Sequence, residues 1–296
     1  MTRTVPQLDT IPEPCRRQAE RLAGTPAEWA LLAHNRRQTT WRTRGPQGSW
    51  TVRVGTHDGA AVLARHTAAL RRTCTAVPAL SYGRHAVSGH LGTIAWLITP
   101  WLEGPTTWKA LEPAREGSWE RREPLAAAVA LAAAVARLHQ AGWVHGNIQP
   151  HHAIHQPDGN IALLDVTWTS HHQHLRPSGR FRGGPVQLAS PELLARAEDA
   201  TAPAYTTQSD DTYTLAASLW WASSGTWHHD FTKAGIASTR GLPTTYLRRV
   251  LLTEIMPRST LTAWPELEEA LATVLWAPEP QRPTALQLAQ WLRELM

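Results

Sequence analysis

The stretch VHGNIQPHHAIHQPDGNIALLD, residues 144–165, guides the interpretation of the whole chain. It begins as a polar loop rich in amide and imidazole side chains and continues into the turn PDGN, whose residues favour a tight reversal. The apolar run IALL follows and ends on the carboxylate of Asp165. This pattern predicts a short buried strand over residues 161–165, with a polar loop before it and an acidic side chain at its end.

The segments on either side of this stretch differ in the spacing of their apolar residues. The earlier part of the chain holds short β-branched runs separated by turns, and these predict strands at ALLAH, TTWRTR, SWTVRVG and within HLGTIAWLITPWLEG. Helical spacing is confined there to residues 16–22 and 58–73, but it dominates from residue 124 onward, in segments 124–139, 209–225 and 267–295. Strands first and helices later, meeting near residue 103, indicate a small β-rich lobe joined to a larger helical lobe.

The bulk composition narrows the function classes. The chain has 296 residues, a net charge of +5 and only two cysteines, which predicts a folded cytoplasmic protein without a disulfide framework. Its longest weakly polar run, residues 124–138, is shorter than the roughly 20 residues of a membrane-spanning helix, so we expect no membrane association. Arginine pairs are scattered and not interleaved with a nucleic-acid-binding motif, so we expect an acidic partner rather than nucleic acid.

Four separated segments resemble, in the same order, elements of the protein-kinase-like superfamily, on its Ser/Thr protein kinase branch. They are LHQAGWVHGNIQPHHAI with the following IALLD, LASPELL at residues 188–194, SDDTYTLAASLWWASSG at 209–225, and APEPQRPTALQLAQWLREL at 277–295. The resemblance implies an α+β class and a two-lobed kinase-like fold, with a small β-rich N-lobe and a larger, mainly helical C-lobe. We expect an N-terminal extension with a short helix at residues 1–27, the N-lobe at 28–104 and the C-lobe at 105–296.

The resemblance assigns structural roles to four side chains. Glu192 and Arg282 stand where the family forms a buried ion pair that ties the activation segment to the large lobe. Asp211 matches an aspartate that holds the backbone of the catalytic loop, and His145 matches a histidine packed beneath that loop. We expect these four residues to support the fold rather than to take part in chemistry.

The reactive positions of the loop depart from the family pattern. Asn147 stands where the family has its catalytic carboxylate, and an amide can orient a hydroxyl but cannot accept its proton at neutral pH. Gln149 replaces a lysine that steadies the transferred phosphoryl group. His152 replaces a magnesium-binding asparagine, although imidazole suits softer metals than magnesium. Asp165 keeps the position of the main magnesium ligand.

The N-terminal half shows a second set of departures. Arg53 falls where the family has the lysine that grips the nucleotide phosphates, and His66 falls where a glutamate pairs with that lysine. The turn AHNRRQTT contains no glycine, so its side chains obstruct close approach to phosphate. The segment from Thr99 to Leu102 matches the stretch that contacts adenine, so we expect ATP with magnesium to bind weakly or not at all.

Seven histidines between His145 and His174 leave a metal site as an alternative. In this hypothesis His151, His152 and His155 face one another and bind a metal such as zinc with Asp165, while the other interpretation is a polar loop that happens to use histidine.

The segment from residue 166 to residue 190 contains no acidic residue. It carries Arg176, Arg180, Arg182 and three histidines, a composition that suits an acidic peptide or a solvated loop. The simultaneous changes at reactive positions predict a pseudokinase that acts as a scaffold or allosteric partner for a protein or peptide. The alternative is an atypical ATP-dependent phosphotransferase acting on Ser or Thr of a peptide or on a small molecule, and a third is a metal- or nucleotide-sensing module.

Overall fold

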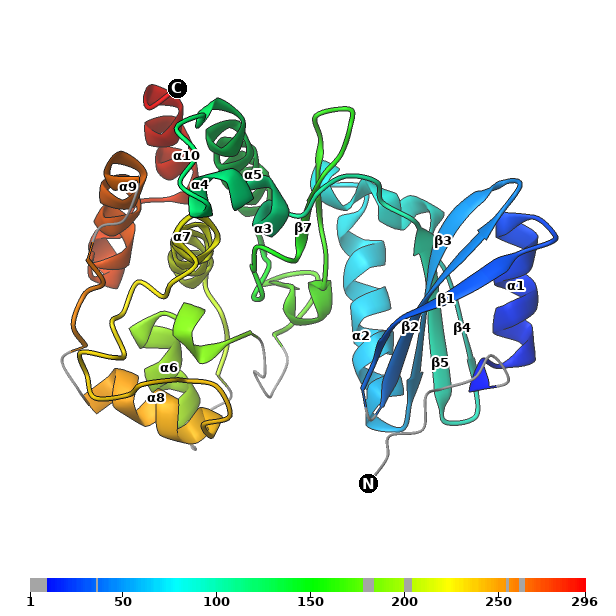
Figure 1. Cartoon of the computed structure of the whole chain (residues 1–296). Helices are drawn as coiled ribbons and strands as arrows, with labels where there is room; N and C mark the ends of the chain where they lie inside the picture. The colour runs from blue at the N-terminus through cyan, green and yellow to red at the C-terminus, as the bar shows by residue number, and fades with distance from the viewer. Residues whose placement is uncertain (1–9, 36, 178–183, 200–203, 254–255, 261–263) are drawn as a thin grey trace. The chain divides into compact units, whose positions relative to one another are not determined.

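The computed structural model describes the chain except for residues 1–9, 36, 178–183, 200–203, 254–255 and 261–263 (Figure 1). The chain divides into two compact units, Met1–Leu102 and Glu103–Met296. The first holds a five-stranded antiparallel sheet, and most of the helices belong to the second. The observed class is therefore α+β, as the sequence predicts.

The sheet of the first unit has the strand order β1-β2-β3-β5-β4. Its strands are β1 (Glu28–His34), β2 (Gln38–Gly45), β3 (Gly48–Thr56), β4 (Val87–Leu91) and β5 (Ile94–Pro100). The predicted strands are all present. The turn between β2 and β3 is closed by the pair Gly45 and Gly48, where the sequence has its GPQG turn.

Helices cover both faces of this sheet. Val52 and Val54 of β3 belong to a buried cluster with α1 (Glu13–Ala23), whereas Arg53 between them contacts α2 (Asp58–Thr73). Since neighbouring side chains of a strand point to opposite faces, α1 and α2 lie on opposite faces of β3. The helix predicted at residues 58–73 has these bounds in the structure. The 3₁₀ segment η2 (Pro78–His85) follows α2.

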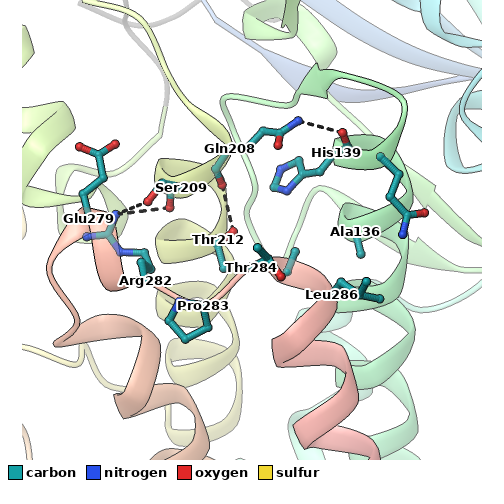
Figure 2. Close-up of a pocket in the computed structure, with 12 residues that line it drawn as sticks. Ala136, His139, Gln208, Ser209, Thr212, Glu279, Arg282, Pro283, Thr284 and Leu286 are labelled. Atoms are coloured by element: carbon teal, nitrogen blue, oxygen red, sulfur yellow. Dashed lines mark hydrogen bonds between the residues drawn. The ribbon is translucent and has the colours of Figure 1, made fainter.

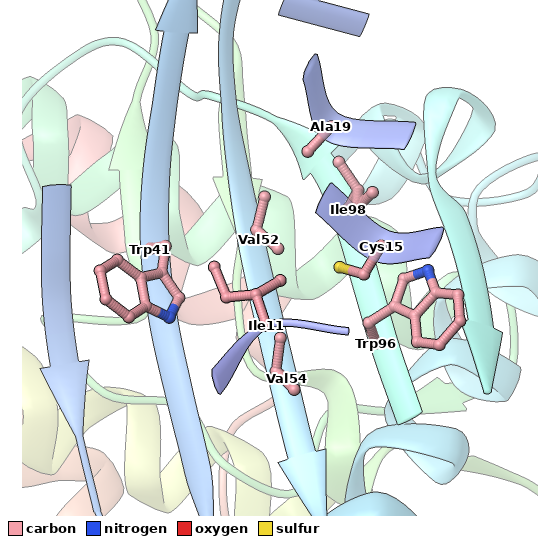
Figure 3. Packing of buried hydrophobic residues seen from close by; sticks show 8 residues of the cluster. All are labelled: Ile11, Cys15, Ala19, Trp41, Val52, Val54, Trp96 and Ile98. Carbon is pink, nitrogen blue, oxygen red and sulfur yellow. The ribbon is translucent and has the colours of Figure 1, made fainter. Parts of the chain in front are cut away.

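The N-terminal helix supplies part of the core rather than a loose extension (Figure 3). The buried cluster shown there consists of Ile11, Cys15, Ala19, Trp41, Val52, Val54, Trp96 and Ile98. Cys15 and Ala19 have no exposed surface, and they come from successive turns of α1 on the side that faces the sheet. The helix is longer at both ends than the predicted residues 16–22.

The second unit is built mainly from helices. They are α3 (Thr107–Ala110), α4 (Glu112–Arg115), α5 (Arg122–Gln140), α6 (Pro191–Glu198), α7 (Gln208–Ser224), α8 (Thr244–Thr253), α9 (Pro265–Leu275) and α10 (Ala285–Glu294). The short strands are β6 (Trp143–Val144), β7 (Ala153–His155), β8 (Ile161–Leu163) and β9 (Ser170–His171), and the 3₁₀ turns are η3 (Val166–Trp168), η4 (Val186–Leu188) and η5 (Glu279–Gln281).

Two long helices form the interior of this unit and fix the loop between residues 144 and 153. The alanine-rich α5 is buried along most of its length and packs against α10, and α7 contacts α9 and α5. Helix α7 begins with a capping box in which Thr207 and Asp210 satisfy each other's backbone N–H groups. It ends at Gly225, whose left-handed backbone (φ 75°) closes the last turn. Among the described residues, no helix has the length and apolar character needed to cross a bilayer.

Candidate functional site

The stretch quoted at the outset folds as a loop followed by a two-stranded hairpin. Strands β7 and β8 pair antiparallel, with Ala153 opposite Leu163, and the chain leaves β8 towards Asp165. The backbone of Asp165 is left-handed (φ 52°, ψ 59°), a conformation that is rare for residues other than glycine but accessible to aspartate. The sharp change of direction there places the Asp165 carboxylate against the side chain of Asn147.

A continuous set of hydrogen bonds joins the polar side chains of this loop. The Asn147 Nδ2 group donates to Asp165 Oδ2 at 2.7 Å, and Gln149 Nε2 donates to Asn147 Oδ1 at 2.7 Å. The hydroxyl of Thr167 donates to the other carboxylate oxygen of Asp165 at 2.8 Å. An ionised carboxylate only accepts hydrogen bonds, so the N–H₂ end of the Asn147 amide must face Asp165.

The backbone of the loop is fixed by the carboxylate of Asp211 in the first turn of α7. This carboxylate accepts hydrogen bonds from the backbone N–H of His145 at 2.6 Å and from that of Gly146 at 2.9 Å. His139, near the end of α5, approaches the same carboxylate through Nε2 at 3.2 Å. Asp211 is 1% exposed, so a buried acceptor holds two backbone donors of the loop, in the role that the sequence predicts.

Two of the three histidines of the loop, His145 and His152, contact its backbone. His145 is fully buried, and its Nδ1 accepts a hydrogen bond from the N–H of Asn147 at 3.2 Å. Burial is the main cause that lowers the pKa of His145 below its usual value, so the imidazole is held neutral. His152 Nδ1 lies 3.1 Å from the carbonyl oxygen of Asn147. Both predicted loop histidines are thus in the same network as Asn147 and Asp165.

The Glu192–Arg282 ion pair expected from the sequence is present. Arg282 donates to both carboxylate oxygens of Glu192, at 3.0 and 2.9 Å, and to the hydroxyl of Ser209 at 2.9 Å. The Arg282 side chain is 1% exposed and that of Glu192 is 25% exposed. The pair connects α6 to the segment that precedes α10, and Ser209 extends the connection to α7.

Replacing Glu192 with glutamine is expected to lower the free energy of unfolding by about 1–2 kcal/mol. The buried guanidinium of Arg282 would keep a hydrogen-bond acceptor but lose its opposite charge, while partial exposure of residue 192 screens part of the loss. Urea unfolding measures the change. Glu198→Gln is the matched control because Glu198 pairs with Arg248 on the exposed surface, and its expected loss is below about 0.5 kcal/mol. Equal losses for both variants would contradict a structural role specific to Glu192.

The histidines of the metal hypothesis do not converge in the structure. His151 stacks on Trp108 with ring centroids 5.1 Å apart, while His155 hydrogen-bonds to the Thr107 hydroxyl at 2.8 Å. Among the residues that the structure describes, no group of three or more His, Cys, Asp or Glu side chains is placed to hold a metal ion. The expectation that His151, His152 and His155 face one another with Asp165 was therefore wrong, because the first and third rings turn to partners on α3.

The second group of histidines forms a stack rather than a chelating set. His171 lies 4.6 Å from His172 and 4.4 Å from His174 between ring centroids, with Trp143 also in ring contact at 4.9 Å. Burial and the two neighbouring imidazoles lower the pKa of His171. The histidines of this segment therefore contact one another through their ring faces.

His155 provides a prediction about acid stability. Burial lowers its pKa to about 4, against about 6.5 in an unfolded chain. Between these pH values the unfolded chain binds a proton at His155 that the folded chain does not bind. The contribution of neutral His155 to the free energy of unfolding is therefore complete above pH 6.5 and is lost as the pH falls towards 4. Replacing His155 with glutamine is expected to reduce the slope of unfolding free energy against pH in this window by up to about 1.4 kcal/mol per pH unit.

Chemical unfolding at a series of pH values between 4 and 7 measures that slope. His90→Gln, at an exposed position of β4, is the control and is expected to leave the slope unchanged. An unchanged slope in the His155 variant would show that this side chain titrates alike in both states.

The site residues predicted in the first unit lie on β3, α2 and the end of β5. Arg53 of β3 lies beside His66 of α2, with 3.1 Å between the guanidinium nitrogen and Nδ1, and it reaches Gln38 Oε1 at 3.4 Å. The side chain of His66 is therefore in hydrogen-bond contact with the guanidinium of Arg53. Thr99 pairs with Thr51 inside the sheet, and Leu102 is the last residue of this unit.

Two contributors were not identified from the sequence, namely Thr167 and Gln38. Threonine hydroxyls commonly bond to acceptors two residues away, so the spacing of Thr167 from Asp165 was an available local signal. Gln38 offered no local signal, because its contact with Arg53 depends on strand pairing. Of the basic segment at residues 166–190, Arg180 and Arg182 lie outside the described residues, while Arg176 lies within them.

Comparison of the sequence with known proteins gave no match, either to a family model or to a curated protein.

Proposed function

We propose that this chain has a two-lobed protein-kinase-like fold and acts as a pseudokinase, a scaffold or allosteric partner that binds a protein or peptide. Three contacts inferred from the resemblance support the proposal. Asp211 holds the backbone of the loop at residues 145–146, Glu192 pairs with Arg282, and the Asp165 carboxylate turns towards the loop. An α+β chain with an antiparallel sheet first and helices afterwards is consistent with the same fold.

The observation that carries the functional part is the hydrogen bond from Asn147 to Asp165. Phosphoryl transfer to a hydroxyl is assisted by a group that orients the nucleophile and accepts its proton, and by a carboxylate available to magnesium. At position 147 the end of the side chain nearest Asp165 is a donor, and Gln149 engages its only acceptor oxygen. The site therefore offers no base at that position, and both carboxylate oxygens of Asp165 already accept hydrogen bonds, from Asn147 and from Thr167.

Arg53 favours the second candidate, an atypical ATP-dependent phosphotransferase. Within the described part of the chain the partners of its guanidinium are His66 and Gln38, which are not acids, so its positive charge remains for an anionic group such as phosphate. Magnesium bound through Asp165 and His152 would be needed as well. We place this candidate second because Asn147 cannot serve as a base.

The partner of the proposed pseudokinase is an acidic peptide or protein surface. The segment at residues 166–190 contains basic and imidazole side chains but no acid, and the whole chain carries a charge of +5. Opposite charge on a partner would speed association and reduce non-specific pairing with basic proteins.

Thermal unfolding with ATP, with and without MgCl₂, tests the proposal together with transfer of labelled phosphate to acidic and basic peptide pools. The pseudokinase predicts no transfer and no magnesium-dependent stabilisation by ATP. Transfer that is abolished by Asp165→Asn would overturn it in favour of the phosphotransferase. The double variant Asn147→Asp and His152→Asn sharpens the test. If it gains phosphate transfer, residues 147 and 152 are the positions whose side chains prevent transfer in the natural sequence.

A further inference from the structure

A cavity of about 310 Å³ lies within the second unit and is lined by residues of α5, α7 and the segment that leads into α10 (Figure 2). The end of α5, the first turn of α7 and the first turn of α10 meet around it, as Figure 2 shows. Its volume is at the lower end of the range of small-ligand sites, about 300–1,000 Å³. A cavity of this size accommodates a short peptide segment with one large side chain.

The acidic, basic and imidazole side chains around this cavity already have partners. Arg282 is paired with Glu192, His139 contacts Asp211, and Glu279 accepts a hydrogen bond from the Thr207 hydroxyl at 3.3 Å. A charged ligand would have to be desolvated without gaining an opposite charge, which is costly. The cavity therefore suits an uncharged ligand.

Two side-chain amides give the cavity its remaining hydrogen-bonding capacity. Gln208 donates through Nε2 to the carbonyl oxygen of His139 at 2.8 Å, and within the described part of the chain its side-chain Oε1 has no partner. The side chain of Gln140, in the last turn of α5, has no partner there either. An amide presents both a donor and an acceptor, which is the pattern that a peptide group complements.

Apolar side chains form the rest of the lining. Ala136 and Pro283 lie beside the amides, and Leu286 of α10 is 42% exposed at the cavity, a large fraction for leucine. A ligand side chain that covered Leu286 would remove this apolar surface from water.

We propose that this cavity binds an uncharged, extended segment of a partner protein, with its peptide groups on Gln140 and Gln208 and an apolar side chain against Leu286. The inference stands independently of the proposed function, because it rests on residues of the second unit alone. It also predicts communication with the loop, since His139 lines the cavity and shares the Asp211 carboxylate with the backbone of His145 and Gly146.

Nuclear magnetic resonance titration of the full chain with N-acetyl-leucine N-methylamide tests this proposal. We expect a dissociation constant on the order of 1 mM, with shifts of the Gln140 and Gln208 side-chain amides and of the backbone amides of His145 and Gly146. N-acetyl-leucine with a free carboxylate is expected to bind at least tenfold more weakly. Equal binding of the charged compound, or no shift at the two glutamines, would overturn the proposal.

Surface variants provide matched controls. Gln140→Ala and Leu286→Ala are expected to weaken binding of the neutral compound at least fivefold. Gln290→Ala in the middle of α10 and Leu295→Ala just after its end change exposed positions that do not line the cavity, and both are expected to leave binding unchanged. Equal effects in both pairs would show that the compound binds elsewhere. Binding at the cavity without a shift at residues 145 and 146 would overturn the communication with the loop.

Discussion

Replacing Asp211 with alanine is expected to lower the free energy of unfolding by about 3–5 kcal/mol. The Asp211 carboxylate is 1% exposed and is the acceptor for the N–H groups of His145 and Gly146 as well as the neighbour of His139. Alanine would leave two backbone donors without an acceptor in a place that water does not reach. Each such donor costs about 1–3 kcal/mol, and hydrogen bonds to a charged acceptor lie at the upper end of that range.

Urea unfolding followed by tryptophan fluorescence measures this loss. Asp211→Asn keeps one acceptor oxygen, so its loss of unfolding free energy is expected to be about half that of the alanine variant. It can still be measured if the alanine variant does not fold. Asp158→Ala is the matched control. Asp158 also accepts a backbone N–H, from Asn160 at 3.0 Å, but on an exposed turn, so its loss is expected below about 1 kcal/mol. A loss of that size at Asp211 would show that the loop does not depend on this carboxylate.

The second large effect is expected when Asn147 is replaced with aspartate. The variant would place a second carboxylate against Asp165, where the structure has a donated hydrogen bond of 2.7 Å, in a position that is 5% exposed. Two adjacent carboxylates cannot both ionise without repulsion, and of the side-chain hydrogen bonds of residue 147 only the one from Gln149 would be kept. We expect a loss of about 2–4 kcal/mol at pH 7.

This loss has a defined pH dependence. Repulsion would raise the pKa of the carboxylate pair in the folded protein above the unfolded value of about 4. Between the two values the folded protein binds the extra proton, so the loss is absent below about pH 4, grows as the pH rises towards the raised pKa and is complete above it. Unfolding curves from pH 4 to 8 follow this change.

Magnesium and a control variant complete the experiment. Two carboxylates form a hard oxygen site, so MgCl₂ is expected to restore part of the stability of Asn147→Asp but not to stabilise the natural sequence. Asn160→Asp makes the same change beside Asp158, since Asn160 Nδ2 donates to Asp158 at 2.9 Å on an exposed turn. Its loss is expected below about 1 kcal/mol. If Asn147→Asp and Asn160→Asp lost similar amounts of unfolding free energy, the hydrogen bond from Asn147 to Asp165 would contribute no more to stability than the one on the exposed turn.

The regular elements were largely predictable because their signals are local. The strands of the first unit follow from β-branched runs between turns, and the helix at residues 58–73 follows from the spacing of Val62, Leu63 and Leu70. The position of α1 was not predictable, because its amphipathic pattern does not specify which surface it covers. Only tertiary packing shows that Cys15 and Ala19 face the sheet.

The candidate site was predictable in its membership but not in its geometry. The order of the motifs pointed to Asn147, Asp165 and Asp211, and the structure connects Asn147 to Asp165 and Asp211 to the loop. The direction of the Asn147 amide depends on having a carboxylate on one side and Gln149 on the other, which no local pattern encodes. The choice between a metal site and a polar loop could not be made from the sequence, because the proximity of histidines in sequence does not determine the direction of their rings on a loop.

The cover that α1 provides for the sheet has a practical consequence for the design of fragments. A fragment of the first unit that starts at residue 28 would leave Trp41, Trp96 and Ile98 without their partners on one sheet face. Such a surface promotes self-association, so insolubility of that fragment would reflect its boundary rather than a dependence on the second unit. Fragments for expression therefore need to begin before Ile11.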